Sequence, residues 1–161
     1  MLSAARRYWP LWLALVASAI LIVAEFTHLY SIRVVTVTVR SATVGSHHGY
    51  ALAIIGAASV VMAIGAVVGG SRPAAWALLL LAIAALVVAL AVDLPVVNDT
   101  GLYGRNFEQA RAKAEIGFKL ETAGAVLLLL SAVAILVVRP ARREAGPRRA
   151  RPADVVSPDA G

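Results

Sequence analysis

The chain contains four long apolar stretches, and they constrain its fold more than any other feature of the sequence. They cover about residues 8–26, 50–69, 74–93 and 120–138. Each is close to the roughly 20 residues that an α-helix needs to cross the hydrocarbon of a bilayer. None alternates between polar and apolar residues as the strands of a membrane β-barrel do. We therefore predict an all-α membrane fold, in which residues 1–139 form a bundle of four transmembrane helices.

The composition supports a lipid environment and excludes several kinds of chemistry. The 161 residues are 60% hydrophobic and 15% charged, whereas ordinary soluble domains contain roughly 25% charged residues. The chain has no cysteine, which excludes disulfides, thiolate metal sites and cysteine nucleophiles. It also has no nucleotide-binding loop and no hydrolase, kinase or zinc-protease motif. We therefore expect a protein that is not an enzyme and that needs no cofactor.

The distribution of basic residues predicts the orientation of the four helices. Two arginines precede the first stretch, one lies between the second and third, and six follow the fourth, so nine lie on the side where both termini are expected. Six basic residues lie in the two loops on the other side. Because basic residues concentrate in cytoplasmic loops, both termini are expected in the cytoplasm, in a bacterial inner membrane. A cleavable signal peptide is the alternative interpretation of the first stretch, since Arg6 and Arg7 precede it and Ala17-Ser18-Ala19 resembles a cleavage site.

The last part of the chain, residues 140–161, is rich in arginine, proline and alanine. Such a composition is typical of a disordered segment, and we expect it to form a cytoplasmic tail. Basic residues beside a membrane attract anionic lipid, so the expected partners are the bilayer and anionic lipid at this tail. No aromatic residue accompanies the charge, and we therefore expect no nucleic-acid partner.

The first outer loop, residues 27–49, differs in pattern from the apolar stretches. Val35, Val37 and Val39 alternate with Thr36, Thr38 and Arg40, a period of two that is typical of a β-strand with one apolar face. A lone strand is unstable in water, so we expect it to pair with a second strand at residues 41–44 or with the other outer loop. The prediction is a small extracytoplasmic β-strand or hairpin cap, with its valine face resting on the bundle and a turn at Gly45 to Gly49.

The second outer loop, residues 94–119, begins with Pro95 and a turn at residues 98–101. Phe107, Ala110, Ala114 and Phe118 then follow at spacings close to one face of a helix. These spacings predict a helix that either continues into the fourth span or bends at its start.

Five residues at the outer edges of the apolar stretches could form a site. Glu25, Asp93 and Glu121 end or begin three of the stretches, and His47 and His48 precede the second. Carboxylates and imidazoles are suitable ligands for divalent metals, so these residues could form a cation or proton site at the outer mouth of the bundle. The alternative is structural: the acids would sit at helix ends and pair with Arg33, Arg40 or Arg105.

Small residues predict where helices pack closely. Gly65 and Gly69 form a GxxxG pattern near the inner end of the second stretch, and Ala85 and Ala89 are the expected partner positions on the third. Such pairs let two helix backbones approach each other. The same pattern could instead support a homo-oligomer or a membrane-protein partner.

The chain resembles, in overall plan, the small uncharacterised four-helix membrane proteins of high-GC bacteria. The stretches Arg33-Val34-Val35-Thr36-Val37 and Gly117-Phe118-Lys119-Leu120-Glu121 carry this resemblance. The β-bearing outer loop is also similar in plan to claudins, although the cysteine pair and loop tryptophan of that family are missing. The resemblance implies no catalytic residue. We expect a role in interaction, assembly or envelope organisation, with a small transporter or channel subunit as the alternative.

Overall fold

The structure is a computed structural model that describes residues 2–35 and 37–138, with the side chains of residues 2–7 excepted. The predicted tail at residues 140–161 lies outside the described residues. Within them the chain is mostly helical, with one small β-sheet.

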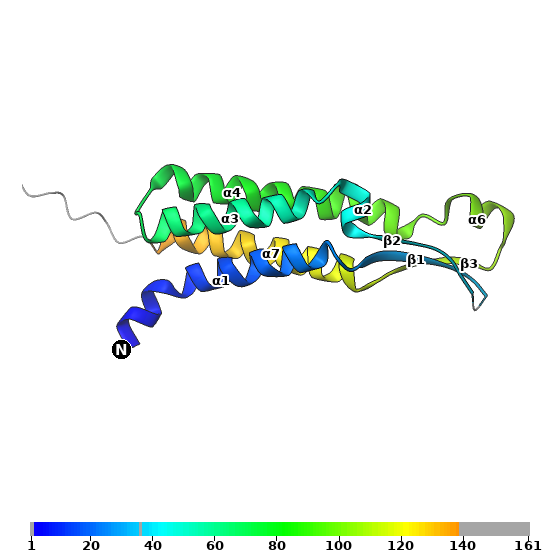
Figure 1. Ribbon diagram of the computed structural model, residues 1–161, viewed down its shortest axis with the longest axis horizontal. Coiled ribbons are helices and arrows are strands. Elements are labelled where there is room, and N and C mark those ends of the chain that lie inside the picture. Colours follow the sequence, from blue (N-terminus) through cyan, green and yellow to red (C-terminus); the bar gives the residue numbers. More distant parts are fainter. Residues whose placement is uncertain (1, 36, 139–161) are drawn as a thin grey trace, which may run out of the picture.

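Four long helices form an antiparallel bundle. They are α1 (Leu2–Ala24), α3 (Ala51–Val67), α4 (Arg72–Val87) and α7 (Ile116–Val137), and a π-helix, η1 (Val88–Asp93), extends α4. Each helix packs against two others, in the cyclic order α1, α3, α4, α7. Figure 1 shows that α1 and α4 run in one direction and that α3 and α7 return. The start of α1 and the end of α7 therefore lie at one end of the bundle, and the sheet lies at the other.

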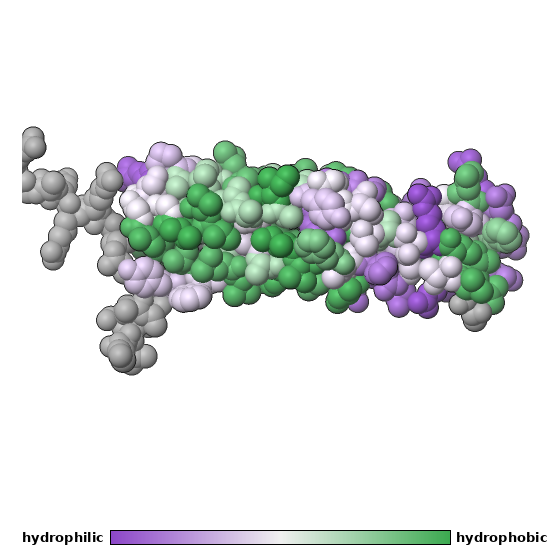
Figure 2. All heavy atoms as spheres, in the orientation of Figure 1, coloured by the Kyte–Doolittle hydropathy of each residue, from purple (hydrophilic) through white to green (hydrophobic). Residues whose placement is uncertain are grey.

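Two helical segments are long and apolar enough to cross a membrane. They are Arg72–Asn106 and Ile116–Val137, and the apolar segments Tyr8–Ala24 and Ala51–Val67 are shorter. Large apolar side chains are exposed on all four long helices, and Figure 2 shows them as a broad band over the helical part of the molecule. Trp12, Ile54, Leu80 and Leu130 are examples.

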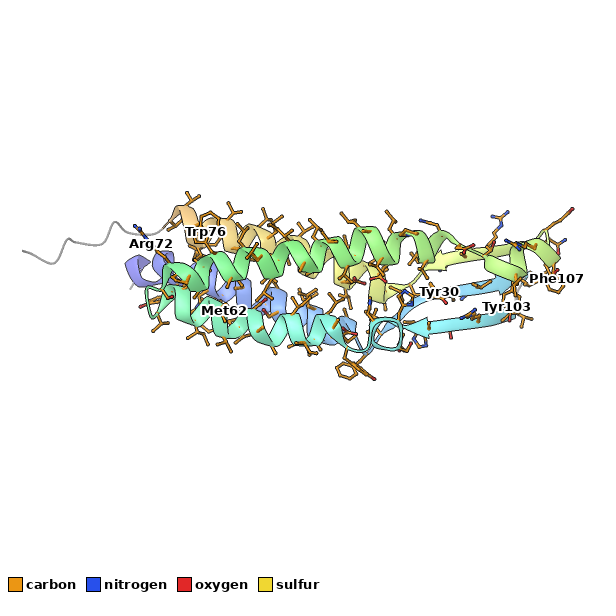
Figure 3. All side chains as sticks on the ribbon, turned by 90° about the horizontal axis from the view of Figure 1, so that it is seen from above. Tyr30, Met62, Arg72, Trp76, Tyr103 and Phe107 are labelled. Atoms are coloured by element: carbon orange, nitrogen blue, oxygen red, sulfur yellow. The ribbon has the colours of Figure 1, made fainter. Side chains whose placement is uncertain are left out.

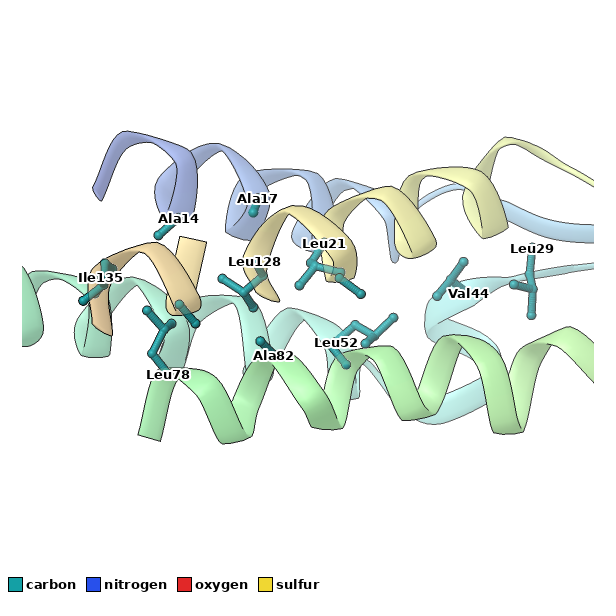
Figure 4. Close-up of a cluster of buried hydrophobic side chains, with 14 of the residues drawn as sticks. Ala14, Ala17, Leu21, Leu29, Val44, Leu52, Leu78, Ala82, Leu128 and Ile135 are labelled. Carbon is teal, nitrogen blue, oxygen red and sulfur yellow. The ribbon is translucent and has the colours of Figure 1, made fainter. Parts of the chain in front are cut away.

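The core of the bundle consists of small residues and leucines. Ala17, Leu21, Leu78, Ala82 and Leu128 are fully buried at its centre, as Figure 4 shows. The alanines among them take up little space between the helices, so the helix backbones can approach each other closely.

The predicted helix-packing residues do not lie opposite one another. A Cβ atom on Gly65 would lie 3.4 Å from the Cβ of Ala74, in the first turn of α4, and one on Gly69 would meet the backbone of Gly65. Because α3 and α4 are antiparallel, Ala85 and Ala89 lie more than ten residues further along α4, about 16 Å or more away along its axis. They are fully buried, but they are not the partners of Gly65 and Gly69.

The cap is a three-stranded antiparallel sheet. β1 (His28–Val34) and β2 (Val37–Thr43) form a hairpin in the first outer loop, and β3 (Ala110–Ala114) from the second outer loop pairs with the other edge of β1. The predicted hairpin cap is therefore confirmed. The predicted partner at residues 41–44 is not a separate strand, because residues 41–43 belong to β2, and the other outer loop pairs with β1 instead.

Three details of the first-loop prediction are wrong. The chain reverses at Val35, the first residue of the alternating pattern, where φ is +58°. Val35, Val37 and Val39 are exposed and do not rest on the bundle. The buried strand is β1, whose Leu29, Tyr30 and Ile32 supply the apolar face instead. The predicted turn at Gly45 to Gly49 is largely a short helix, α2 (Val44–His48).

The predicted helix through Phe107, Ala110, Ala114 and Phe118 is also wrong. Residues 110–114 form β3, in which alanines alternate with Arg111 and Lys113. This period of two fits pairing with β1, and tertiary pairing overrides the helix propensity of alanine. The loop contains two short helices before β3, α5 (Leu94–Asn98) and α6 (Gly101–Asn106).

Candidate metal centre

Helix α2 holds His47 and His48 against the end of α1. The Thr43 hydroxyl caps α2 by accepting a hydrogen bond from the Ser46 backbone N–H, and Gly49 ends the helix with φ +59°. The backbone N–H of Gly45 donates to the carbonyl of Glu25 at 3.0 Å, and that of Val44 donates to Thr27 at 3.1 Å. The two imidazoles are therefore fixed relative to the bundle by backbone hydrogen bonds.

Asp93 is the last residue of the π-helix that extends α4. Pro95 follows two residues later; it cannot donate to the carbonyl of Ala91, and its ring crowds that position. A widened π turn accommodates such a proline, and π turns are frequent at functional sites. The result is that the Asp93 carboxylate is fully buried among the helices.

Glu121 lies one turn into α7 and is also fully buried. Its helix starts beneath the sheet: a Cβ atom at Gly117 would lie 2.5 Å from the carbonyl oxygen of His28. Only a glycine permits this approach, which brings the first turns of α7 close to the cap.

Glu25 follows the last residue of α1 and is almost fully buried. Its Oε1 accepts hydrogen bonds from the backbone N–H groups of Leu52 at 2.7 Å and Ala53 at 3.1 Å. These N–H groups belong to the first turn of α3, where a negative charge is favoured by the helix dipole.

The structure brings the predicted outer ring together around Asp93. The Nε2 of His48 lies 3.2 Å from Asp93 Oδ2, and the Nε2 of His47 lies 3.7 Å from Asp93 Oδ1. One donor atom from each of His48, Asp93 and Glu121 lies within 4.8 Å of the other two. Glu25 is close enough to act electrostatically on Glu121. We call His47, His48, Asp93 and Glu121, with Glu25 at their edge, the outer cluster.

The outer cluster brings three carboxyl groups into the buried end of the bundle next to the sheet. Both carboxylate oxygens of Asp93 and of Glu121, and Oε2 of Glu25, are buried and accept no hydrogen bond within the described part of the chain. Burying a carboxylate without a partner is costly, because the interior solvates charge poorly. The only positive groups paired with these acids among residues 2–35 and 37–138 are the two histidines.

The structural interpretation of the ring, in which arginines compensate the acids, is therefore wrong in its details. Within the residues that the structure describes, no ion pair joins Glu25 or Asp93 to Arg33, Arg40 or Arg105. The N-terminus of α3 takes that role for Glu25, and the histidines take it for Asp93.

The donor set of the outer cluster suits a divalent transition metal. Tetrahedral coordination at about 2.1 Å separates ligand atoms by roughly 3.4 Å. One donor atom each from His48, Asp93 and Glu121 lies within 4.8 Å of the other two, and the His48–Asp93 pair is already at 3.2 Å, so the three are close to that spacing. Imidazole and carboxylate together favour zinc or manganese over calcium, which prefers oxygen ligands alone.

A second feature next to the outer cluster has no signal in the sequence. A cavity of about 600 Å³ lies between the sheet and the segment of α5 and α6, and His47 is part of its wall. Tyr30, Tyr103 and Phe107 also line it, and Figure 3 shows all three at the sheet end of the molecule. No sequence pattern indicates this cavity, because Tyr30 comes from β1 and the other two residues come from α6 and its C-cap, about 70 positions later.

Comparison with known proteins identifies no relative: no protein-family model, no curated protein and no solved structure matches the sequence. The resemblance to four-helix membrane proteins of high-GC bacteria and to claudins therefore stays a prediction.

Proposed function

We propose that the chain spans the membrane four times, with α1, α3, α4–η1 and α7 as its spans. The cyclic antiparallel packing supports this, because each of the two longer apolar segments packs against a shorter one. At 1.5 Å per residue, the 17 residues of α3 cover about 26 Å, close to the hydrocarbon thickness. The exposed apolar band over all four helices would then face lipid.

The proposed orientation has both termini in the cytoplasm of a bacterial inner membrane. The order of basic residues in the sequence supports it, because Arg6 and Arg7 precede the first span, Arg72 lies between the second and third, and six further arginines follow the fourth. Trp9, Trp12 and Trp76 are exposed, and Figure 3 shows Trp76 beside Arg72 at that same end. Tryptophan favours the interface between lipid and water, which agrees with a membrane boundary there.

In this orientation, we propose that the protein is not an enzyme and that it binds a divalent metal ion at the outer cluster. The observation that carries the proposal is the group of buried carboxylate oxygens of Asp93 and Glu121, which face His48 and accept no hydrogen bond from the described residues. A divalent cation would neutralise them and use His48 as its third ligand. His47 or water would complete the coordination.

The same geometry favours binding over transport. Between the outer cluster and the opposite end of the bundle, the buried polar side chains that the structure describes are Ser18, Ser59 and Ser131. The Ser131 hydroxyl already donates to the carbonyl of Pro10 at 2.7 Å. Transport of an ion across lipid needs a series of polar groups along its path, and three serines in an alanine-rich core supply few.

An interaction or assembly role is the second candidate, and the cap supports it. β2 is an edge strand of the sheet. Val35, Val37, Leu102 and Phe107 are exposed at the same end of the molecule, and Figure 2 shows apolar residues at its tip. An unpaired edge with apolar side chains can pair with a strand of another chain.

A zinc titration of the purified full-length chain tests the metal proposal. We expect one high-affinity site by calorimetry, and a loss of affinity of at least about tenfold in His48→Ala and in Glu121→Gln. The matched control is His28→Ala, because His28 is exposed in β1 and is the one remaining histidine of the chain. Unchanged zinc affinity in both cluster variants would overturn the proposal.

Cysteine labelling tests the four spans, since the natural chain has no cysteine. Single cysteines at Ser41 and Glu108 should react with an impermeant reagent from outside the cell, and one at Pro73 should react only after the membrane is opened. Labelling at Pro73 from outside would contradict the orientation or the number of spans.

A further inference from the structure

The cavity beside the outer cluster has the size of a small-molecule site. Its volume of about 600 Å³ lies within the range of roughly 300–1,000 Å³ that is usual for such sites. Tyr30 and Ile32 of β1 form part of its wall, and both are more than nine-tenths buried. The cavity therefore has an apolar floor that is fixed by the central strand of the sheet.

Two side chains of opposite charge line the same cavity. Arg40 of β2 is the register partner of Ile32, so the two residues lie side by side in the sheet at the cavity wall. Asp99 approaches from the segment between α5 and α6, where its Oδ1 accepts a hydrogen bond from the Gly101 backbone N–H at 2.8 Å. This bond fixes the Asp99 carboxylate at the wall.

Arg40 and Asp99 do not neutralise each other. No ion pair joins them in the part of the chain that the structure describes, and Arg40 forms no ion pair with any other described residue. A cavity that presents a guanidinium and a carboxylate, with aromatic rings from Tyr30, Tyr103 and Phe107 in its lining, matches a ligand with both charges and an apolar body.

We propose that this cavity binds a small zwitterion, a free amino acid with an apolar side chain. The ligand carboxylate pairs with Arg40, its ammonium group pairs with Asp99, and its side chain packs on Tyr30, Ile32 and Phe107. This binding site is separate from the metal proposal, although His47 borders both the cavity and the outer cluster. The chemistry of the cavity wall requires no metal ion.

Three matched probes test the proposal by calorimetry on the full-length chain in lipid nanodiscs without added metal. L-phenylalanine carries both charges, hydrocinnamate lacks the ammonium group, and phenethylamine lacks the carboxylate. We expect L-phenylalanine to bind at least about tenfold more tightly than either of the other two, because each of them lacks one charge-assisted contact. Absence of L-phenylalanine binding, or equal binding of hydrocinnamate, would overturn the proposal.

Substitutions of Arg40 and Asp99 test which charged group of the ligand each residue binds. Arg40→Gln should weaken L-phenylalanine about tenfold and leave phenethylamine unchanged, and Asp99→Asn should weaken L-phenylalanine similarly and leave hydrocinnamate unchanged. Asparagine keeps the oxygen that accepts from Gly101, so the turn survives. Arg111→Gln is the matched control, since Arg111 is an exposed arginine of β3 outside the cavity lining.

Binding of the amino acid should not depend on the metal site. His48→Ala, which should weaken zinc binding at least about tenfold, is expected to leave the affinity for L-phenylalanine within about twofold, because His48 is not part of the cavity lining. Zinc binding without amino-acid binding would overturn this inference alone, and the reverse result would overturn the metal proposal alone.

Discussion

Glu25 accepts a hydrogen bond from the backbone N–H of Leu52 at 2.7 Å, and this contact joins the end of the first long helix to the start of the second. The same carboxylate has a second oxygen, Oε2, which is buried without a hydrogen bond from the described residues. One side chain therefore caps α3 and also contributes charge to the outer cluster. The stability of the outer end of the bundle and the charge of the cluster are linked through it.

Glu25→Ala should lower the free energy of unfolding by about 1–2 kcal/mol. The substitution leaves the N–H groups of Leu52 and Ala53 without their acceptor in a buried helix start. Glu25→Gln keeps an oxygen at that position and removes a buried negative charge near Glu121, so it should be at least as stable as the natural chain. Unfolding by denaturant, followed by circular dichroism, measures both. If Glu25→Ala and Glu25→Gln lower the free energy of unfolding equally, the stabilising group is the charge of Glu25 and not its hydrogen-bond acceptor.

Zinc should stabilise the protein against unfolding, and a chelator should reverse the effect. A ligand that binds only the folded state at 100 times its Kd stabilises it by about 2.7 kcal/mol. We expect this stabilisation in the natural chain and in His28→Ala, but not in His48→Ala. Because metal ligands must be deprotonated, the stabilisation should decline as the pH falls. A zinc effect that persists in His48→Ala would assign the metal to other residues.

The sequence predicts the long elements well, because their periodicity and length are strong signals. The hairpin cap follows from the period of two in the first outer loop, and the gathering of Glu25, His47, His48, Asp93 and Glu121 at one end follows from their positions at the ends of apolar stretches. The structure confirms the hairpin and brings these side chains together.

The sequence could not predict where the cap reverses or what lies beneath it. The turn contains Val35 with φ +58°, and a β-branched residue gives no signal for a conformation that usually requires glycine or asparagine. β3 has alanine on its inward face, which favours a helix when the segment is read alone. Its pairing with β1 depends on residues about 80 positions away, and no local pattern carries that information.

Gly117→Ala should destabilise the protein by about 1–3 kcal/mol. The added methyl group would meet the His28 carbonyl oxygen at 2.5 Å, and this backbone atom cannot move without shifting β1. The matched control is Gly65→Ala, where the new methyl group meets only the Cβ of Ala74 at 3.4 Å, an ordinary contact. Gly65→Ala should be neutral or slightly stabilising, because alanine favours the helix. The comparison uses denaturant unfolding, and equal effects of the two substitutions would contradict the close approach of α7 to the cap.

Glu115 should make stability depend on acid pH. Its pKa lies below the usual value of 4.5, chiefly because the Ser31 hydroxyl donates to its Oε1 at 2.6 Å, with Lys113 and Arg33 adding favourable charge. A lowered pKa means that the folded state favours the ionised carboxylate. The contribution of Glu115 to the free energy of unfolding is therefore present above pH 4.5 and is lost as the pH falls through the lowered pKa. Glu115→Gln should therefore be less stable than the natural chain at neutral pH, and the difference should shrink as the pH falls below 4.5. Glu108→Gln, at an exposed position, is the control. A stability difference between Glu115→Gln and the natural chain that does not change with pH would show that it does not come from the ionised carboxylate.

Replacement of Glu121 by methionine separates a functional site from a structural one. In the metal-free protein, Glu121→Met removes a buried carboxylate that accepts no hydrogen bond from the described residues and adds an apolar side chain of similar length. Removing it relieves the desolvation cost of a buried polar group that has no partner, so the metal-free variant should be more stable than the natural chain. The same variant should lose zinc binding, so the natural residue would be retained at a cost in stability. Lys119→Met, at an exposed position of the same helix, is the control for added hydrophobicity. Unfolding in chelator and in zinc measures both effects. If Glu121→Met is instead strongly destabilised without metal, the carboxylate holds the bundle together, and the outer cluster is structural.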